Sequence, residues 1–179
     1  MSTAPTIHIR RLAPADAEAF RALRLEALST APEAFGSSPE EESARPMDVV
    51  RSRLADTGPD AIFGAFAGDD LVGMAGFLLS QGIKKRHKGL LWGVFVRAGW
   101  RDRGTGEQLV CAVIDHARSH ALLLQASVVT INASARRVYD RLGFAPYGIE
   151  TRALRVGDTF HDEEMLMLDL TAPSRGETP

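Results

Sequence analysis

The sequence contains one cysteine, Cys111, in 179 residues. A single cysteine cannot form an internal disulfide, so the hydrophobic core must hold the fold together, and this usage is typical of a reducing compartment. No apolar run reaches the roughly 20 residues that a membrane-spanning helix needs. The first residues also lack the charged and then apolar segments of a secretory signal. We therefore expect a cytoplasmic protein without a membrane partner.

An excess of charge of either sign is also missing. The chain has 21 Lys and Arg against 23 Asp and Glu, a formal net charge of −2, which disfavours nucleic acid as a partner. A charged fraction of 25% and an apolar fraction of 45% are those of an ordinary globular protein. The length favours a single domain. We expect that domain at residues 7–170, with a flexible tail at 1–6 and a disordered tail at 171–179.

The most informative stretch is a glycine-rich turn between an apolar strand and an amphipathic helix. Leu90–Val96 is apolar and strand-like, and apolar residues recur on one helical face from Leu109 to Ala117. Gly104 and Gly106 therefore lie where a strand leads into a helix. The unpaired N–H groups of a helix N-terminus bind anions, and glycines let an anion approach them closely. The turn predicts a phosphate or pyrophosphate site.

This glycine pattern departs from the two commonest nucleotide-binding motifs. Thr105 follows Gly104 where a P-loop requires lysine, and Leu109 occupies the third glycine position of a dinucleotide-binding motif. No acidic residue stands about 20 residues further on, where that motif has one for the ribose. A nucleotide-binding protein of another fold is an alternative that these departures disfavour.

The order of the expected elements indicates an α+β fold, with a central mixed, mostly antiparallel sheet of about seven strands flanked by four helices. Glu40, Glu41 and Glu42 fall in a loop between the first two helices. The strand–helix–strand unit at 90–130 predicts a right-handed crossover with parallel strands. Periodicity and turn residues place strands at 7–11, 61–67, 71–80, 89–96, 122–130, 149–156 and 159–168, and helices at 14–28, 46–55, from 104, and at 133–142.

Two motifs resemble those of the GCN5-related N-acetyltransferases (GNAT). Arg101-x-x-Gly104-x-Gly106, after a Val-Phe-Val strand, resembles the family's acetyl-CoA-binding motif. Residues 132–144 resemble its Asn-x-x-Ala-x-x-x-Tyr-x-x-x-Gly-Phe pattern. The resemblance spans residues 7–170 and implies a GNAT-like fold and an acetyl-CoA-dependent N-acetyltransferase, an acyltransferase that transfers the acetyl group directly to an amine. A non-catalytic acyl-CoA-binding or regulatory module on the same fold is the alternative.

The resemblance assigns most candidate site residues to acetyl-CoA. Backbone N–H groups of residues 101–106 would hold the pyrophosphate, and a bulge at Gly93 would free backbone groups of the next residues for the acetyl group and pantetheine. Asn132 and Ala135 would contact the cofactor, although Asn132 also suits a helix N-cap. By resemblance Tyr139 protonates the leaving thiolate, with a packing role as the alternative. The expected cofactor-binding residues are Val94, Phe95, Val96, Arg101, Asp102, Arg103, Gly104, Thr105, Gly106, Asn132 and Ala135.

The acceptor site and the general base are less determined. A lysine-type amine with a pKa of about 10.4 costs about 4 kcal/mol to neutralise near pH 7.5, yet residues 90–96 contain no Asp or Glu. Glu41 and Glu42 are the candidates for acceptor binding and proton removal, with Glu150 and Glu164 as alternatives. Carboxylates there favour a small-molecule amine or peptide amine over an acidic acceptor. The basic run Lys84–Lys88 instead favours an acidic acceptor.

We expect no metal site. His116 and His120 have the helical spacing of metal ligands, but no third ligand is near them in the sequence. The sequence does not decide between a monomer and a homodimer.

Overall fold

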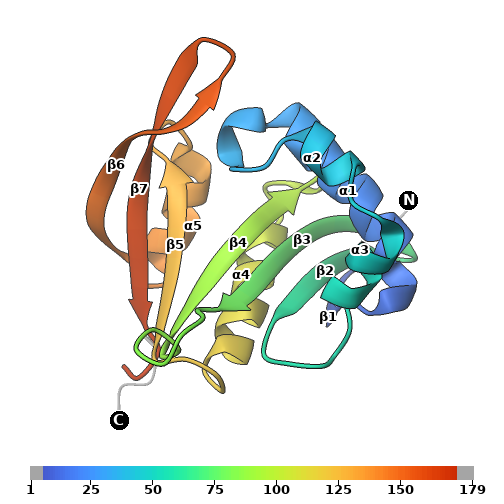
Figure 1. Ribbon diagram of the computed structural model, residues 1–179, viewed down its shortest axis with the longest axis horizontal. Helices are drawn as coiled ribbons and strands as arrows, with labels where there is room; N and C mark the ends of the chain where they lie inside the picture. The colour runs from blue at the N-terminus through green and yellow to red at the C-terminus, as the bar shows by residue number, and fades with distance from the viewer. Residues whose placement is uncertain (1–5, 173–179) are drawn as a thin grey trace.

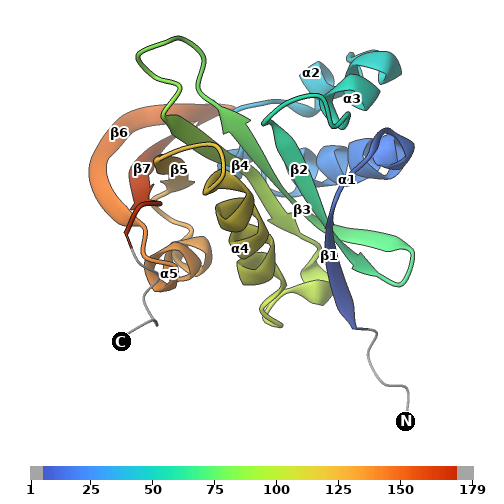
Figure 2. The ribbon, with the colours of Figure 1, turned by 90° about the horizontal axis from the view of Figure 1, so that it is seen from below.

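The computed structural model describes residues 6–172 and contains one seven-stranded sheet with helices on both faces (Figures 1 and 2). The strand order is β1-β2-β3-β4-β5-β7-β6, with β4 and β5 parallel and all other neighbours antiparallel. The predicted mixed, mostly antiparallel sheet is confirmed. The strands are β1 (Ile7–Arg11), β2 (Ala61–Ala67), β3 (Asp70–Leu79), β4 (Lys88–Val96), β5 (Leu123–Val129), β6 (Ala145–Val156) and β7 (Thr159–Asp169).

The described residues contain five α-helices, one more than the sequence predicts: α1 (Ala17–Thr30), α2 (Pro39–Ser43), α3 (Met47–Arg53), α4 (Thr105–Ala117) and α5 (Ala133–Arg141). The additional helix, α2, is formed by the acidic run that was predicted to be a loop. Ser38 and Glu41 cap it reciprocally, because each side chain accepts a hydrogen bond from the other's backbone N–H. Residues 1–5 and 173–179 of the predicted tails lie outside the described residues.

Two hydrophobic clusters hold the layers together, one on each face of the sheet. Figure 2 shows α4 and α5 on one face and α1, α2 and α3 on the other. Leu109 and Val113 of α4 are fully buried in the first cluster, and Phe20 and Leu23 of α1 are fully buried in the second. Burying side chains of this size contributes about 1.5–3 kcal/mol each. No helix within residues 6–172 is long and apolar enough to span a bilayer.

The sheet opens at its centre, between its two parallel strands. β4 and β5 pair only from Lys88 to Leu90, opposite Leu123 to Gln125, and then diverge, as Figure 1 shows. In the diverging part of β4 the register against β3 shifts, and Gly93 has a φ of 66°. The expected bulge at Gly93 is therefore present. The bulge and the divergence leave one edge of β4 without a strand partner.

Candidate active site

A pocket with a volume of about 420 Å³ lies where β4 and β5 diverge. Its walls come from β4 around Gly93, from the end of β5 and from the first turns of α5. Residues from the α1–α3 region and from the β6–β7 hairpin complete the rim, and Figure 1 shows these two parts on opposite sides of the opening. Elements far apart in the sequence therefore meet where the sheet is open.

The bulge exposes the backbone of β4 to this pocket. Gly93 and Val94 line the pocket, whereas the side chains of Phe95 and Val96 are buried in the core clusters. Because β4 pairs with β5 only as far as Leu90, the peptide groups further along this edge are open to a ligand. Of the three predicted cofactor-binding residues in β4, Phe95 and Val96 can therefore contribute only backbone groups.

Replacing Gly93 by alanine should destabilise the protein. A residue with a Cβ atom costs about 1–2 kcal/mol in the left-handed conformation that Gly93 adopts at a φ of 66°. The expected result is a loss of about that size in the free energy of unfolding, measured by urea denaturation. Gly148→Ala is the matched control, because that glycine is also in a strand and a Cβ there would meet no atom within 4 Å. Equal stability of the two variants would contradict the strained bulge.

The N-terminus of α4 presents free N–H groups at the end of the turn that follows β4. Gly104 is the N-cap and has a left-handed φ of 75°, which glycine adopts without steric cost. Within residues 6–172, the N–H groups from Gly104 to Glu107 donate to no protein acceptor. The exposed residues Asp102 and Arg103 precede them. The helix dipole adds partial positive charge, so this terminus is suited to a phosphate group.

Two side chains of the turn between β4 and α4 form hydrogen bonds within that turn. Nε of Arg101 donates to the carbonyl oxygen of Val96 at 2.8 Å. The buried Thr105 hydroxyl donates to the carbonyl oxygen of Trp100 at 3.1 Å. These bonds fix the path of the chain from β4 into α4. Any binding of a phosphate by Thr105 must therefore come from its backbone N–H.

The helix α5 brings three of the predicted residues to the pocket on one face. Asn132 is the N-cap, and its Oδ1 accepts a hydrogen bond from the N–H of Ala135 at 3.1 Å. Asn132, Ala135 and Tyr139 all line the pocket. Tyr139 is 6% exposed, and its ring packs edge-on against Phe144. Burial raises the pKa of the Tyr139 phenol, so the hydroxyl carries its proton at neutral pH.

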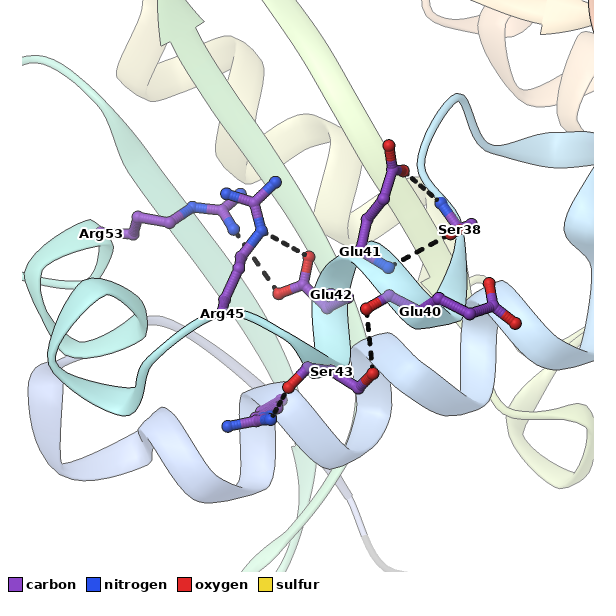
Figure 3. A network of polar contacts seen from close by, with 8 residues as sticks. Ser38, Glu40, Glu41, Glu42, Ser43, Arg45 and Arg53 are labelled. Atoms are coloured by element: carbon purple, nitrogen blue, oxygen red, sulfur yellow. Dashed lines mark hydrogen bonds and ion pairs between the residues drawn. The ribbon is translucent and has the colours of Figure 1, made fainter.

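The two predicted acceptor residues have different positions. The carboxylate of Glu41 accepts from the N–H of Ser38 and caps α2, and Glu41 does not line the pocket. Glu42 does line the pocket and is only 1% exposed. Its carboxylate lies between two arginines, 3.4 Å from Nε of Arg45 and 3.6 Å from Nη1 of Arg53 (Figure 3). Glu42 is therefore already paired with cations of the protein.

The arginines of this pocket were not anticipated from the sequence. Arg24 of α1 joins Arg45 and Arg53 in the lining, so three guanidinium groups accompany Glu42. This surplus corrects the expectation that the acidic run makes the acceptor region negative. Arg24 could have been noticed, because it stands four residues after Phe20 on the apolar face of α1. An arginine at a core-facing position needs an explanation.

Glu163 of β7 was not anticipated either, and it lines the pocket together with Ser127 of β5. The Ser127 hydroxyl donates to Oε1 of Glu163 at 3.0 Å. The neighbouring Glu164, a predicted alternative base, points to the other face of the sheet and pairs with Arg136 of α5. The other alternative, Glu150, is exposed on β6 and is not part of the lining.

His116 of α4 and His120, three residues after the end of that helix, pack against the protein. Nε2 of His116 lies 2.6 Å from the carbonyl oxygen of Pro59, and the rings of His116 and His120 are 4.5 Å apart. Within residues 6–172 no group of three or more His, Cys, Asp or Glu side chains is arranged to hold a metal ion.

A sequence model of the acetyltransferase (GNAT) family matches residues 22–144 of the chain. No curated protein matches the sequence. Many solved structures share the fold at low identity. A GNAT-family acetyltransferase from Streptococcus pneumoniae has a TM-score of 0.77 at 20% identity, with 92% of this chain and 99% of that chain covered. The yncA protein of Salmonella typhimurium, whose structure contains its cofactor acetyl-CoA, has a TM-score of 0.76 at 18% identity, with 97% and 99% covered.

Proposed function

The chain belongs to the acetyltransferase (GNAT) family, and from this premise we propose that it transfers an acetyl group from acetyl-CoA directly to an amine acceptor. One observation carries the proposal. The open edge of β4 at Gly93 and the tyrosine of α5 line the same pocket, and the free N-terminus of α4 lies at the end of the turn that follows β4. A phosphate-binding terminus, a polar backbone edge and a proton donor are the parts that acetyl transfer from a thioester requires.

The residues present fit acetyl-CoA, whose thioester would supply the activated acetyl group. The N–H groups from Gly104 to Glu107 would bind its pyrophosphate. The free backbone edge after Gly93 would polarise the thioester carbonyl and stabilise the oxyanion that forms during attack. Asn132 would contact the pantetheine arm. Tyr139, protonated because it is buried, would donate its proton to the leaving thiolate.

The amine must lose its proton before or during attack, and we assign this role to Glu163. Its carboxylate lines the pocket and is oriented by the hydrogen bond from Ser127. Glu42, the other carboxylate of the lining, is held by Arg45 and Arg53. Within residues 6–172 the Glu163 carboxylate forms no ion pair, so an ammonium group can reach it directly or through water, whereas the Glu42 carboxylate is enclosed by two guanidinium groups.

Glu163→Gln should lower kcat/KM for the amine by at least about tenfold, since general base catalysis is typically worth 10²–10⁴-fold. The deficit should shrink as the pH rises towards the pKa of the acceptor amine, because a neutral amine no longer needs the base. The measurement is thiol release over a pH series. Glu40→Gln, an exposed glutamate of α2 that does not line the pocket, is the control. A loss that is the same at every pH would assign Glu163 a structural role instead.

Thiol release from acetyl-CoA in the presence of polyamines, aminoglycosides, amino acids and peptide N-termini tests the proposal itself. Acceptor-dependent release, with the acetylated product identified by mass spectrometry, is the expected result. The alternative is a non-catalytic acyl-CoA-binding module, for which acetyl-CoA binds but no amine in the panel accelerates thiol release.

A further inference from the structure

The pocket contains a cluster of three arginines, Arg24, Arg45 and Arg53, that one carboxylate cannot neutralise. Arg24 comes from the middle of α1, Arg45 from the segment after α2, and Arg53 from the last residue of α3. Glu42 is the only acidic side chain that pairs with any of them within residues 6–172. Three guanidinium groups against one carboxylate leave an excess of positive charge on this side of the pocket.

The donors of this cluster are buried and lack hydrogen-bond partners. Arg24 is 5% exposed, and its Nε and Nη1 atoms are bonded to no group within residues 6–172. Nε1 of Trp92 is buried without a hydrogen bond as well. Nε of Arg45 and Nη1 of Arg53 make no hydrogen bond either, but they face the Glu42 carboxylate at 3.4 and 3.6 Å, and Oε1 of Glu42 is itself without a hydrogen bond. More than 90% of buried polar groups in proteins have a partner, because leaving one unpaired costs about 1–3 kcal/mol. The buried Nε and Nη1 atoms of Arg24, a residue of the pocket lining that forms no ion pair within residues 6–172, therefore indicate a missing acceptor of hydrogen bonds.

Aromatic rings hold the unpaired guanidinium in place. The Cζ atom of Arg24 lies 4.9 Å from the ring centre of Phe35 and 5.6 Å from that of Trp92, while Arg53 lies 5.2 Å from the Trp92 ring. Trp92 itself packs on Gly76, where a Cβ atom would come within 2.3 Å of the indole. These contacts stabilise the cations through their faces and leave their N–H edges free, so the donors are oriented before any ligand arrives.

The unpaired guanidinium also lies beside the expected reaction centre. A Cβ atom on Gly93 would be 3.6 Å from Nη1 of Arg24, and Gly93 marks the bulge where the thioester is proposed to bind. Burial lowers the pKa of Arg24 to about 10, against the opposing effect of Glu42, so the guanidinium keeps its charge at neutral pH. A negative group bound by Arg24 would therefore belong to a molecule that also reaches the bulge.

We propose that the acceptor is a small amine that also carries an anionic group, a carboxylate or a phosphonate, which the arginine cluster binds. This inference rests on the proposed acetyl transfer and names its acceptor class. A guanidinium recognises planar carboxylates and tetrahedral phosphonates through paired hydrogen bonds. The amine of the same molecule would face Glu163, on the other side of the pocket. A simple alkylamine would place a positive charge near the arginines with no compensating group.

The test compares matched acceptors in the thiol-release assay. Each set contains an amino acid, the amine that its decarboxylation gives, and the corresponding 1-aminoalkylphosphonate, for example phenylalanine, phenethylamine and its phosphonate analogue. The carboxylated or phosphonated member should have a kcat/KM about 10–100-fold above that of the plain amine, as charged hydrogen bonds predict. Comparing the amino acid with its phosphonate analogue shows which of the two anions the site prefers. Equal or better turnover of the plain amines would overturn the proposal.

Variants then assign the preference to the cluster. Arg53→Gln should raise KM for the anionic acceptors about tenfold or more and leave the affinity for acetyl-CoA unchanged. Arg24→Lys, which keeps the charge and loses the planar fork, should have an effect in the same direction. Arg51→Gln is the matched control on the same helix, since Arg51 is 52% exposed, pairs with Glu18 and is absent from the lining. If Arg53→Gln weakens acetyl-CoA binding instead, the arginines bind the cofactor and the proposal is wrong.

A direct binding experiment separates this inference from the proposed reaction. If no amine is acetylated, NMR titration of the protein with phenylalanine, its phosphonate analogue and phenethylamine still measures recognition of the anion. Selective binding of the anionic compounds, lost in Arg53→Gln and kept in Arg51→Gln, would support the anion site although acetyl transfer had failed. Absence of binding by both anionic compounds would overturn the anion site.

Discussion

Replacing Tyr139 by phenylalanine should lower kcat by about 10²–10⁴-fold, the usual value of general acid catalysis, with little change in acetyl-CoA affinity. The substitution keeps the ring that packs on Phe144 and removes only the hydroxyl. Because burial raises the pKa of the phenol, the wild-type hydroxyl stays protonated across the neutral range. The loss in kcat should therefore be nearly constant between pH 6 and 9.

Tyr147→Phe provides the control for this experiment. Tyr147 lies on β6, is 50% exposed, and accepts a hydrogen bond from Gln125. Loss of that hydroxyl should leave kcat unchanged. Steady-state thiol release gives kcat for both variants, and calorimetric titration gives the affinity for acetyl-CoA. A Tyr139→Phe protein with wild-type kcat would show that Tyr139 is a packing residue and that the thiolate is protonated by another donor.

Gly106→Val should weaken acetyl-CoA binding by at least tenfold, or about 1.4 kcal/mol. Gly106 is in the first turn of α4, where the N–H groups are free, and a branched side chain there would block the approach of a pyrophosphate. Gly106→Val should also reduce the stability of the fold less than Gly104→Val does. Gly104 has a left-handed φ of 75°, whereas a Cβ on Gly106 would make an ordinary contact of 3.8 Å with Val96.

Calorimetric titration with acetyl-CoA measures this effect, and thermal unfolding confirms that the variant is folded. Asp115→Val introduces the same side chain at an exposed position in the last turn of α4 and should leave the affinity unchanged. Wild-type affinity in a folded Gly106→Val protein would rule out the N-terminus of α4 as the pyrophosphate site.

Local features of the sequence were sufficient to predict every strand, four of the five helices of residues 6–172 and the backbone features of the β4–α4 turn and α5. The positive φ of Gly93 and Gly104, the N-cap role of Asn132, and the spacing that places Tyr139 on the same face of α5 depend on neighbours within a few residues. Such features follow from steric and hydrogen-bonding rules that act within one turn or one strand. The capping box of Ser38 and Glu41 was local too, and reading it would have predicted α2.

The acceptor half of the site was decided by tertiary structure. The acidic run Glu40–Glu42 predicted a negative surface because only the charges of neighbouring residues in the sequence were considered. In the fold, Glu42 meets Arg53 of the next helix, and Arg24 enters the same pocket from α1. Electrostatic potential depends on distances in space, and these partners are set by how helices pack on the sheet. The charge of one segment therefore does not give the charge of the pocket that it helps to form.

Glu163 and Glu164 show the same limit within a single strand. Adjacent strand residues must point to opposite faces, so the sequence determined that only one of them can face the pocket. Which one was decided by the register of β7 on β5, where Glu163 lies opposite Val129 and Glu164 opposite Val128. A shift by one residue would exchange their positions. The sequence by itself determined most of the secondary structure and the glycine turn before α4, because these depend on neighbours along the chain. Only the packed sheet decided which charges face the pocket, because those side chains come from elements far apart in the sequence.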